Sequence, residues 1–176
     1  MTEIRDAGPG DAEAIAALHA ESWRAHYRGI LPDAYLDGEV FAERQAFWRD
    51  ALGAPRSGRL VMVATREAAL AGFVAIVRDG EPDFGAEIEN LHVRPGLHGR
   101  GLGRRLLGEA VGRLAADGVT SACLWVFDAN AAATRFYRRL GGTADKQGLD
   151  PFAGAHAPHT RIVWPDLAAL ERACGG

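Results

Sequence analysis

A glycine-rich turn between an expected strand and an expected helix is the feature that most constrains this chain. The turn reads His98-Gly99-Arg100-Gly101-Leu102-Gly103-Arg104. It follows the β-like run 86–93, and apolar residues recur at helical spacing from Leu102 to Leu114 after it. Glycines let the backbone approach an anion closely, and the N–H groups at a helix start point outward. The turn therefore predicts a phosphate site, with compensating charge from Arg100, Arg104 and Arg105.

Two well-known phosphate loops do not match this turn. No Gly-Lys-Ser/Thr follows the glycines, as a P-loop requires, and Arg104 stands where a dinucleotide-binding fingerprint needs glycine. A helix-entry turn without any ligand stays open as an alternative when the turn is taken alone.

The order of the remaining elements predicts the fold class. Few residues separate the three β-like runs 60–64, 72–77 and 86–93, which favours antiparallel hairpins. The full order is strand, two helices, three strands, helix, strand, helix, and one or two strands, which predicts an α+β fold with one mixed sheet covered by helices. The other expected elements are a strand at 2–6, a helix running from Asp11 towards Tyr27, a helix at about 33–52, the helix after the glycine turn up to Gly118, a strand at 123–127, a helix from Asn130 to Leu140, a strand within 160–164 and a short tail helix after Pro165.

Length and charge limit the possible classes of protein. The 176 residues are expected to form one domain, 1–176, with its core motifs in 86–142 and a tail at 165–176. A formal net charge of −3 gives no electrostatic footprint for nucleic acid. We find no signal peptide and no apolar run long enough for a membrane span, so a cytoplasmic protein is expected. Cys123 and Cys174 match neither a disulfide framework nor a metal motif.

A second motif about 30 residues after the first connects the turn to a known family. Together the two motifs resemble the GNAT superfamily of N-acetyltransferases, specifically over 86–142 and in element order over the whole chain. The segment 21–32 is similar to a common bacterial subgroup of that superfamily. The motifs are Glu87-Ile88-Glu89-Asn90-Leu91-His92-Val93-x-Pro95-x-x-His98-Gly99-Arg100-Gly101-Leu102-Gly103 and Asn130-x-x-Ala133-x-x-Phe136-Tyr137-x-x-Leu140-Gly141.

The resemblance implies a fold and a co-substrate. The fold would be a central, mostly antiparallel sheet in which the strands carrying Val93 and Cys123 splay apart, leaving a slot for acetyl-CoA. No metal is implied. The strand segment Leu91-His92-Val93 would lie along the pantetheine arm and pair with it through backbone groups of Leu91 and Val93.

The resemblance also assigns roles around the slot. The turn from His98 to Arg104 would hold the pyrophosphate, Asn130 would contact the cofactor near its pantetheine arm, and the Tyr137 hydroxyl would lie near its sulfur. The family usually has glutamine or arginine where His98 stands, so weaker side-chain help to the phosphate is expected there. His98 has no partner at metal-ligand spacing.

Acetylation of an amine requires a base, because only about one alkyl ammonium in a thousand is neutral near pH 7.4. Glu87 and Glu89 share one face of their strand by period two, so spacing does not separate them. Position in the resembling motif favours Glu87, with Glu89 or a bound water as the alternative; each glutamate is otherwise a solvated strand residue. The same alternation places His92 on the opposite face as a packed histidine, and it would act as a base only if a bulge re-aimed the strand.

The departing thiolate requires an acid, for which Tyr137 is the candidate. Its alternative role is core packing beside Phe136. The acceptor would enter near the first two helices, where Trp23 and Tyr27 lie one turn apart and form either an aromatic wall or part of the core. A polyamine, an amino acid or a peptide amine remains open as acceptor.

An acidic run is a further candidate for attracting a basic acceptor, although such a run is more often the solvated face of a helix. A homodimer is an open expectation, because dimers are common in similar proteins, but the sequence identifies no interface. The alternative to an enzyme is an acyl-CoA-binding sensor with little or no catalysis. The acidic run comprises Asp33, Asp37, Glu39 and Glu43.

Overall fold

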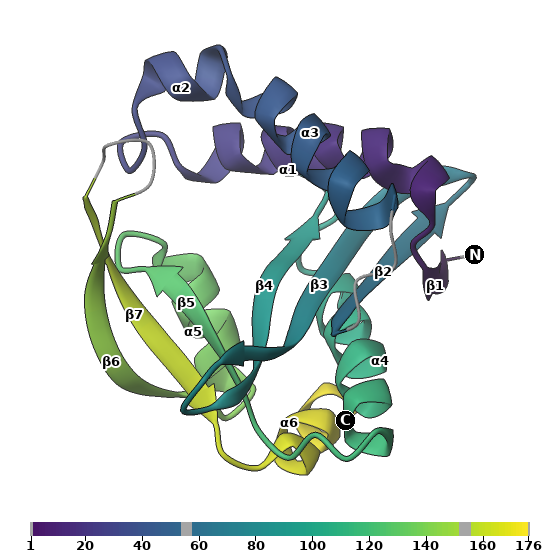
Figure 1. The fold of residues 1–176 in the computed structure, drawn as a ribbon, viewed down its shortest axis with the longest axis vertical. Helices are drawn as coiled ribbons and strands as arrows, with labels where there is room; N and C mark the ends of the chain where they lie inside the picture. Colours follow the sequence, from purple (N-terminus) through teal and green to yellow (C-terminus); the bar gives the residue numbers. More distant parts are fainter. Residues whose placement is uncertain (1, 54–57, 152–155, 176) are drawn as a thin grey trace.

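Short apolar runs pair into a seven-stranded sheet with the order β1-β2-β3-β4-β5-β7-β6 (Figure 1). The computed structural model describes residues 2–53, 58–151 and 156–175. Neighbouring strands are antiparallel except for β4 and β5, as the short connections predicted. The strands are β1 (Thr2–Asp6), β2 (Arg59–Arg66), β3 (Ala69–Glu81), β4 (Gly85–Val93), β5 (Ala122–Phe127), β6 (Thr143–Asp150) and β7 (Ala157–Trp164).

Helices cover both faces of the sheet and divide the core in two. One core lies under α1 and α3, where Ile15, Trp48 and Phe73 are fully buried. The other lies under α4 and α6, and the stripe from Leu102 to Leu114 is buried in it as its spacing predicted. None of the helices in the described part of the chain is long and apolar enough to cross a membrane. The helices are η1 (Pro9–Asp11, a 3₁₀ turn), α1 (Ala12–His26), α2 (Asp33–Asp37), α3 (Val40–Gly53), α4 (Leu102–Ala116), α5 (Ala131–Arg139) and α6 (Leu167–Gly175).

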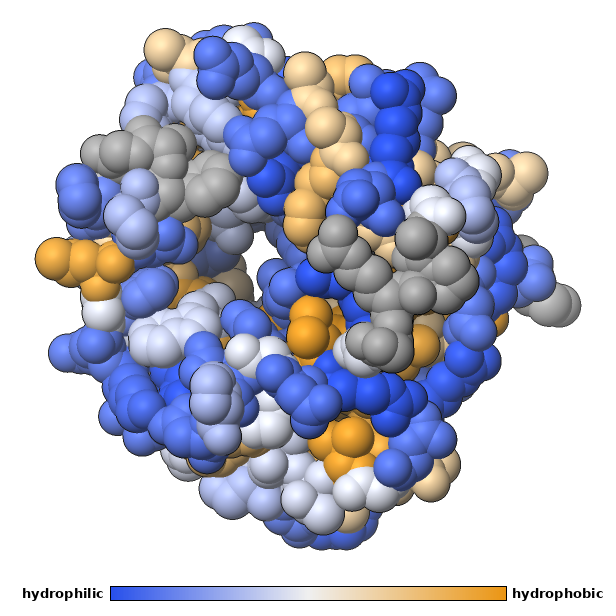
Figure 2. Space-filling view, in the orientation of Figure 1, coloured by the Kyte–Doolittle hydropathy of each residue, from blue (hydrophilic) through white to orange (hydrophobic). Residues whose placement is uncertain are grey.

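The sheet splits between β4 and β5, which confirms the expected splay. These two strands pair only at Ala86 with Ala122 and at Glu87 with Cys123. Beyond this point they diverge (Figure 1), and the space-filling view is hollowed at its centre between the half carrying β4 and the half carrying β5 and β7 (Figure 2). The split leaves one long edge of β4 without a strand partner, which is the slot expected for a cofactor.

A bulge in β4 corrects the predicted orientation of His92. Ala75 pairs with Asn90 but Ile76 pairs with Ile88, so Glu89 is the extra residue on β4. His92 lies opposite Phe73 and Glu87 lies opposite Val77, and both partners are on the same face of β3. His92 therefore faces α1 on the same side as Glu87, contrary to the strict alternation that placed it on the other face.

Two further elements differ from the predictions. The single helix expected at 33–52 is broken at Gly38 into α2 and α3, and a Cβ at Gly38 would lie only 2.9 Å from the Ala34 carbonyl oxygen. The last strand is longer than 160–164 and pairs with β6, a mostly exposed strand without apolar alternation. Asp11 does not cap α1 with its side chain; its carboxylate accepts from the Gly8 N–H and pairs with Arg5.

Candidate active site

The glycine turn forms an open backbone cradle at the start of α4. Gly99 and Gly101 have φ values of 75° and 77°, in the left-handed region that favours glycine. A Cβ added to either residue would meet no atom within 4 Å, so space lies directly outside the turn. Gly103 lies against β4, where an added Cβ would be 3.5 Å from Cγ2 of Val93. Close backbone approach and an open outer side are what a pyrophosphate needs at a helix N-terminus.

Side chains around the turn complete this cradle. Arg100, Arg104 and Arg105 are exposed beside it and provide positive charge. His98 is directed back to the protein, since its Nε2–H donates to the Val93 carbonyl oxygen at 2.9 Å. His98 therefore fastens the turn to β4. This contact gives the histidine a structural role at the start of the turn.

The unpaired edge of β4 presents backbone groups to the split. The Arg94 N–H donates to the Ala71 carbonyl oxygen of β3 at 2.8 Å. Because N–H and C=O groups alternate between the two sides of a strand, those of Leu91 and Val93 point to the β5 side. The edge can therefore pair with an extended amide-containing arm, as the predicted pantetheine contact requires.

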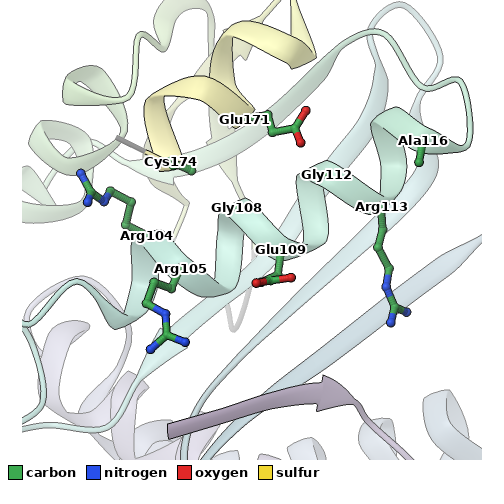
Figure 3. Close-up of a pocket in the computed structure, with 10 residues that line it drawn as sticks. Arg104, Arg105, Gly108, Glu109, Gly112, Arg113, Ala116, Glu171 and Cys174 are labelled. Carbon is green, nitrogen blue, oxygen red and sulfur yellow. The ribbon is translucent and has the colours of Figure 1, made fainter.

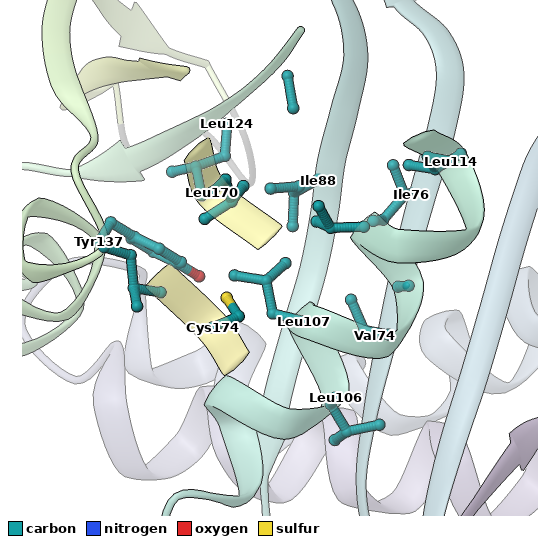
Figure 4. Close-up of a cluster of buried hydrophobic side chains, with 14 of the residues drawn as sticks. Val74, Ile76, Ile88, Leu106, Leu107, Leu114, Leu124, Tyr137, Leu170 and Cys174 are labelled. Carbon is teal, nitrogen blue, oxygen red and sulfur yellow. The ribbon is translucent and has the colours of Figure 1, made fainter. Parts of the chain in front are cut away.

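α5 supplies the capping amide and the phenol predicted for the site. Asn130 begins the helix, and its Oδ1 accepts from the Ala133 N–H at 3.2 Å. The Tyr137 ring packs edge-to-face against Trp164 with centroids 6.0 Å apart, and it points into the buried cluster (Figure 4). Burial, with a smaller contribution from Tyr27, raises the pKa of the Tyr137 hydroxyl above its usual value. The phenol is therefore protonated at neutral pH.

A cavity of about 240 Å³ lies across the split, lined by α1 and β4 on one side and by β5, β6 and β7 on the other. It brings the predicted base candidates Glu87 and Glu89 together with the predicted aromatic wall of Trp23 and Tyr27. The wall is continuous, because the Tyr27 ring meets Phe127 edge-on with centroids 5.1 Å apart. The lining residues are Trp23, Tyr27, Glu87, Ile88, Glu89, Trp125, Phe127, Asp150 and His159.

Five of these lining residues were absent from the predicted site, and Ile88 is the one that lies between the two predicted glutamates. Trp125 and Phe127 alternate with apolar neighbours on β5, and this period-two pattern was a signal that both face one side. Asp150 and His159 come from β6 and β7, and nothing in their local sequence marks them as neighbours of Glu87. The predicted acidic run contributes nothing to the lining: Asp33 and Asp37 pair with the exposed Arg28, and Glu43 accepts from Tyr35.

The two glutamates of β4 have different electrostatic surroundings. Glu89 forms an ion pair with Arg59. No ion pair is recorded for Glu87 among the described residues, and its side chain rests against Gly80, where a Cβ would lie 2.4 Å from Cβ of Glu87. Burial raises the pKa of Glu87, with further contributions from Glu89 and Glu81. Glu87 is therefore a better proton acceptor than an ordinary glutamate.

His92 belongs to a buried polar cluster behind the cavity. Its Nδ1 lies 2.8 Å from Oγ of Ser22, and its ring is 4.7 Å from that of His19. Trp48 Nε1–H donates to His19 Nδ1 at 3.0 Å. Burial, helped by His26 and His98, lowers the pKa of His92 to about 3, so the ring is neutral. His92 is thus a hydrogen-bonded packed histidine, and its low pKa makes it a poor base despite the bulge.

A buried guanidinium fixes the cavity wall on the far side of the split. Arg161 of β7 is 1% exposed and donates to Asp83 at 2.8 Å and, through Nε, to Asp145 at 3.0 Å. It also pairs with Glu81, whose carboxylate accepts from Trp125 Nε1–H at 2.7 Å. This network joins the β3–β4 hairpin to β6 and β7 and holds Trp125 in place.

A larger groove of about 580 Å³ runs along the outside of α4 and α6 and is lined by Arg104, Arg113, Glu109 and Glu171 among others (Figure 3). It lies apart from Glu87 and contains no candidate base or acid of the reaction. Within the described residues, no group of histidine, cysteine, aspartate and glutamate side chains is arranged to hold a metal ion.

Comparison with known proteins identifies the arrangement. The family model described as "Acetyltransferase (GNAT) family" matches residues 15–142. Uncharacterised N-acetyltransferase YuaI of Bacillus subtilis is 28% identical over 97% of each chain, and streptothricin acetyltransferase of Streptomyces lavendulae is 30% identical over 79% of this chain and 80% of its own.

Solved structures share the fold. PaiA N-acetyltransferase of Thermoplasma acidophilum, in complex with coenzyme A, superposes with a TM-score of 0.74 at 20% identity over 93% of this chain and 99% of its own. YncA of Salmonella typhimurium, with its cofactor acetyl-CoA, gives a TM-score of 0.69 at 23% identity over 95% and 94% of the two chains.

Proposed function

Because this chain belongs to the acetyltransferase (GNAT) family, we propose that it transfers the acetyl group of acetyl-CoA to a primary amine bound in the cavity beside Glu87. The observation that carries this proposal is the position of the cavity. It holds a carboxylate of raised pKa at the point where β4 and β5 part.

The residues of the slot fit acetyl-CoA as the co-substrate. The cradle from His98 to Arg104 suits the pyrophosphate, and the backbone groups of Leu91 with the N–H of Val93 suit the amides of the pantetheine arm. The Val93 carbonyl oxygen already accepts from His98. Structural neighbours in complex with coenzyme A or acetyl-CoA support the same placement. Asn130 lies at the start of α5, where we place it near the pantetheine arm.

The proton transfers follow from the two titratable groups. Glu87 removes a proton from the bound ammonium, directly or through a water, and the neutral nitrogen attacks the thioester carbonyl. The carbon–sulfur bond breaks, and Tyr137 donates its proton to the departing thiolate. Deprotonating an alkyl ammonium at pH 7.4 costs roughly 4 kcal/mol of free energy, and a carboxylate placed beside it offsets part of that cost.

Thiol release from acetyl-CoA tests this function across a panel of alkylamines, amino acids, peptides and streptothricin. We expect turnover with at least one amine. Glu87→Gln should lower kcat/KM by about 100-fold or more, because a general base contributes roughly 10²–10⁴. Glu89→Gln is the matched control, because Glu89 lines the same cavity two residues further along β4. This variant should lower kcat/KM by less than about tenfold, since Glu89 is already paired with Arg59.

The alternative function is that of an acyl-CoA sensor with the same fold. No thiol release with any amine, together with micromolar binding of acetyl-CoA, would establish the sensor and reject the enzyme. Equal losses in Glu87→Gln and Glu89→Gln would leave the enzyme but remove Glu87 as its base.

A further inference from the structure

The acceptor cavity has carboxylates on both sides of the split in the sheet. Glu87 and Glu89 lie on β4, and Asp150 lies at the end of β6 on the other half of the sheet. Among the described lining residues there is no lysine or arginine, and the one imidazole is His159, whose Nδ1 is 4.0 Å from Oδ2 of Asp150. A bound molecule therefore meets negative charge at two separated places.

Aromatic rings line the same cavity as these carboxylates. Tyr27 contacts both Trp23, with centroids 5.5 Å apart, and Phe127, at 5.1 Å. Trp125 stacks on His159 with centroids 4.2 Å apart. The faces of such rings attract organic cations and pack well against methylene groups. The lining thus suits an aliphatic chain with a positive group.

The charge of Asp150 acts on the aromatic wall of the cavity. Burial raises the pKa of Tyr27 to about 12, and the charge of Asp150 contributes to the shift. The negative potential of Asp150 therefore acts on the Tyr27 ring. A cationic acceptor gains from this potential, whereas an anionic acceptor is repelled by it.

The cavity is large enough for a short acceptor. A volume of about 240 Å³ corresponds to roughly eight water molecules at about 30 Å³ each. A chain of about four or five carbons with two amino groups fits this volume.

We propose that the acceptor is a short aliphatic amine with a second cationic group, such as a diamine of about four or five carbons. The reacting amine lies at Glu87, and the second cation lies between Asp150 and the rings of Tyr27 and Phe127. This assignment rests on the proposed acetyl transfer and adds the class of acceptor to it.

A paired-substrate assay tests the assignment with the full chain and saturating acetyl-CoA. Kinetics of thiol release are compared for 1,5-diaminopentane and pentylamine, with diamines of other lengths and phenethylamine alongside. We expect kcat/KM for the diamine to exceed that of the monoamine about tenfold, a difference of about 1.4 kcal/mol. This is well above the twofold advantage that two equivalent amines provide.

Asp150→Asn should lower kcat/KM for the diamine more than kcat/KM for pentylamine, and so remove most of the preference for the diamine. The matched control is Asp37→Asn, which removes a carboxylate of the acidic run outside the cavity and should leave both substrates unchanged. Unchanged binding of coenzyme A shows that the Asp150 variant is folded. If it does not fold, Phe127→Leu removes one ring face and should reduce the same preference.

The outcomes separate this assignment from the proposed function. Thiol release with pentylamine or phenethylamine at the rate of the diamine overturns the second-cation site while leaving the acetyltransferase in place. Loss of the preference in Asp37→Asn but not in Asp150→Asn also overturns it. An absence of thiol release with every amine rejects the proposed function itself, and the acceptor class with it.

Discussion

The phenol of Tyr137 carries a proton at neutral pH, which a general acid requires. It is 9% exposed, and burial raises its pKa, which keeps the proton bound but makes the phenol a weaker acid towards a thiolate. Replacing Tyr137 with Phe retains the ring packed on Trp164 and removes only the proton donor. We expect kcat to fall about 10- to 100-fold, with the Kd of coenzyme A unchanged.

Tyr27→Phe is the matched control for this variant, because Tyr27 is a second buried tyrosine that lines the acceptor cavity. It should change the KM of the amine more than kcat. Full turnover by the Tyr137 variant at saturating substrates would show that water protonates the thiolate and that Tyr137 serves only in packing.

The raised pKa of Glu87 predicts a pH dependence at the same scale. The carboxylate must be ionised to accept a proton, so activity rises with pH through this pKa, and burial places the rise above the usual range of a glutamate. The pH profile of kcat/KM should therefore contain an acidic limb that Glu87→Gln abolishes and Glu89→Gln retains. An acidic limb that survives in the Glu87 variant would assign the base to another group.

Single elements show where sequence periodicity predicts geometry and where it does not. The stripe from Leu102 to Leu114 predicted α4 because a helix with one buried face has a strong signal. The bulge at Glu89 has none, since an extra residue in a strand depends on the neighbouring strand β3. One unrecognised bulge was enough to place His92 on the wrong face.

The glycine turn is the element whose conformation is most specific to function. Gly101→Ala places a side chain at φ 77° and in the open space outside the turn, so we expect coenzyme A to bind at least tenfold more weakly. Gly96→Ala is the matched control, with φ 87° and equally open surroundings just before the turn. Both variants should lose about 1 kcal/mol of stability, and only the first should lose binding.

Titration of coenzyme A by calorimetry, with urea unfolding of the same samples, separates these effects. Equal binding losses in the two variants would mean that strain in the loop, and not the cradle itself, limits affinity.

At the scale of the whole molecule, the two halves of the site differ in how far they could be predicted. The cofactor side lies within Glu87–Tyr137, where motifs of residues close together in the sequence predict the site. The acceptor side joins α1, β4, β5, β6 and β7. Its residues, Asp150 and His159 among them, become neighbours only through strand pairing that no local pattern encodes.

Two histidines in the core, His19 and His92, make the stability of the fold depend on pH. Burial lowers the pKa of His92 to about 3, and burial lowers that of His19 well below its usual value, whereas both rings titrate near 6.5 when unfolded. The unfolded chain thus binds more protons below about pH 6.5. Their contribution to stability is complete above that pH and is lost as the pH falls towards about 3.

Urea unfolding between pH 7 and pH 5 should therefore show the free energy of unfolding decreasing by about 1 kcal/mol per pH unit for each histidine below pH 6. His92→Gln retains a polar partner for Ser22 and should reduce this slope, although it lowers stability at pH 7. Phe73→Leu, a change in the same core, should lower stability at every pH and leave the slope intact. An unchanged slope in His92→Gln would mean that acid does not destabilise the protein through His92, and would leave His19 or ion pairs such as those of Arg161 as the source.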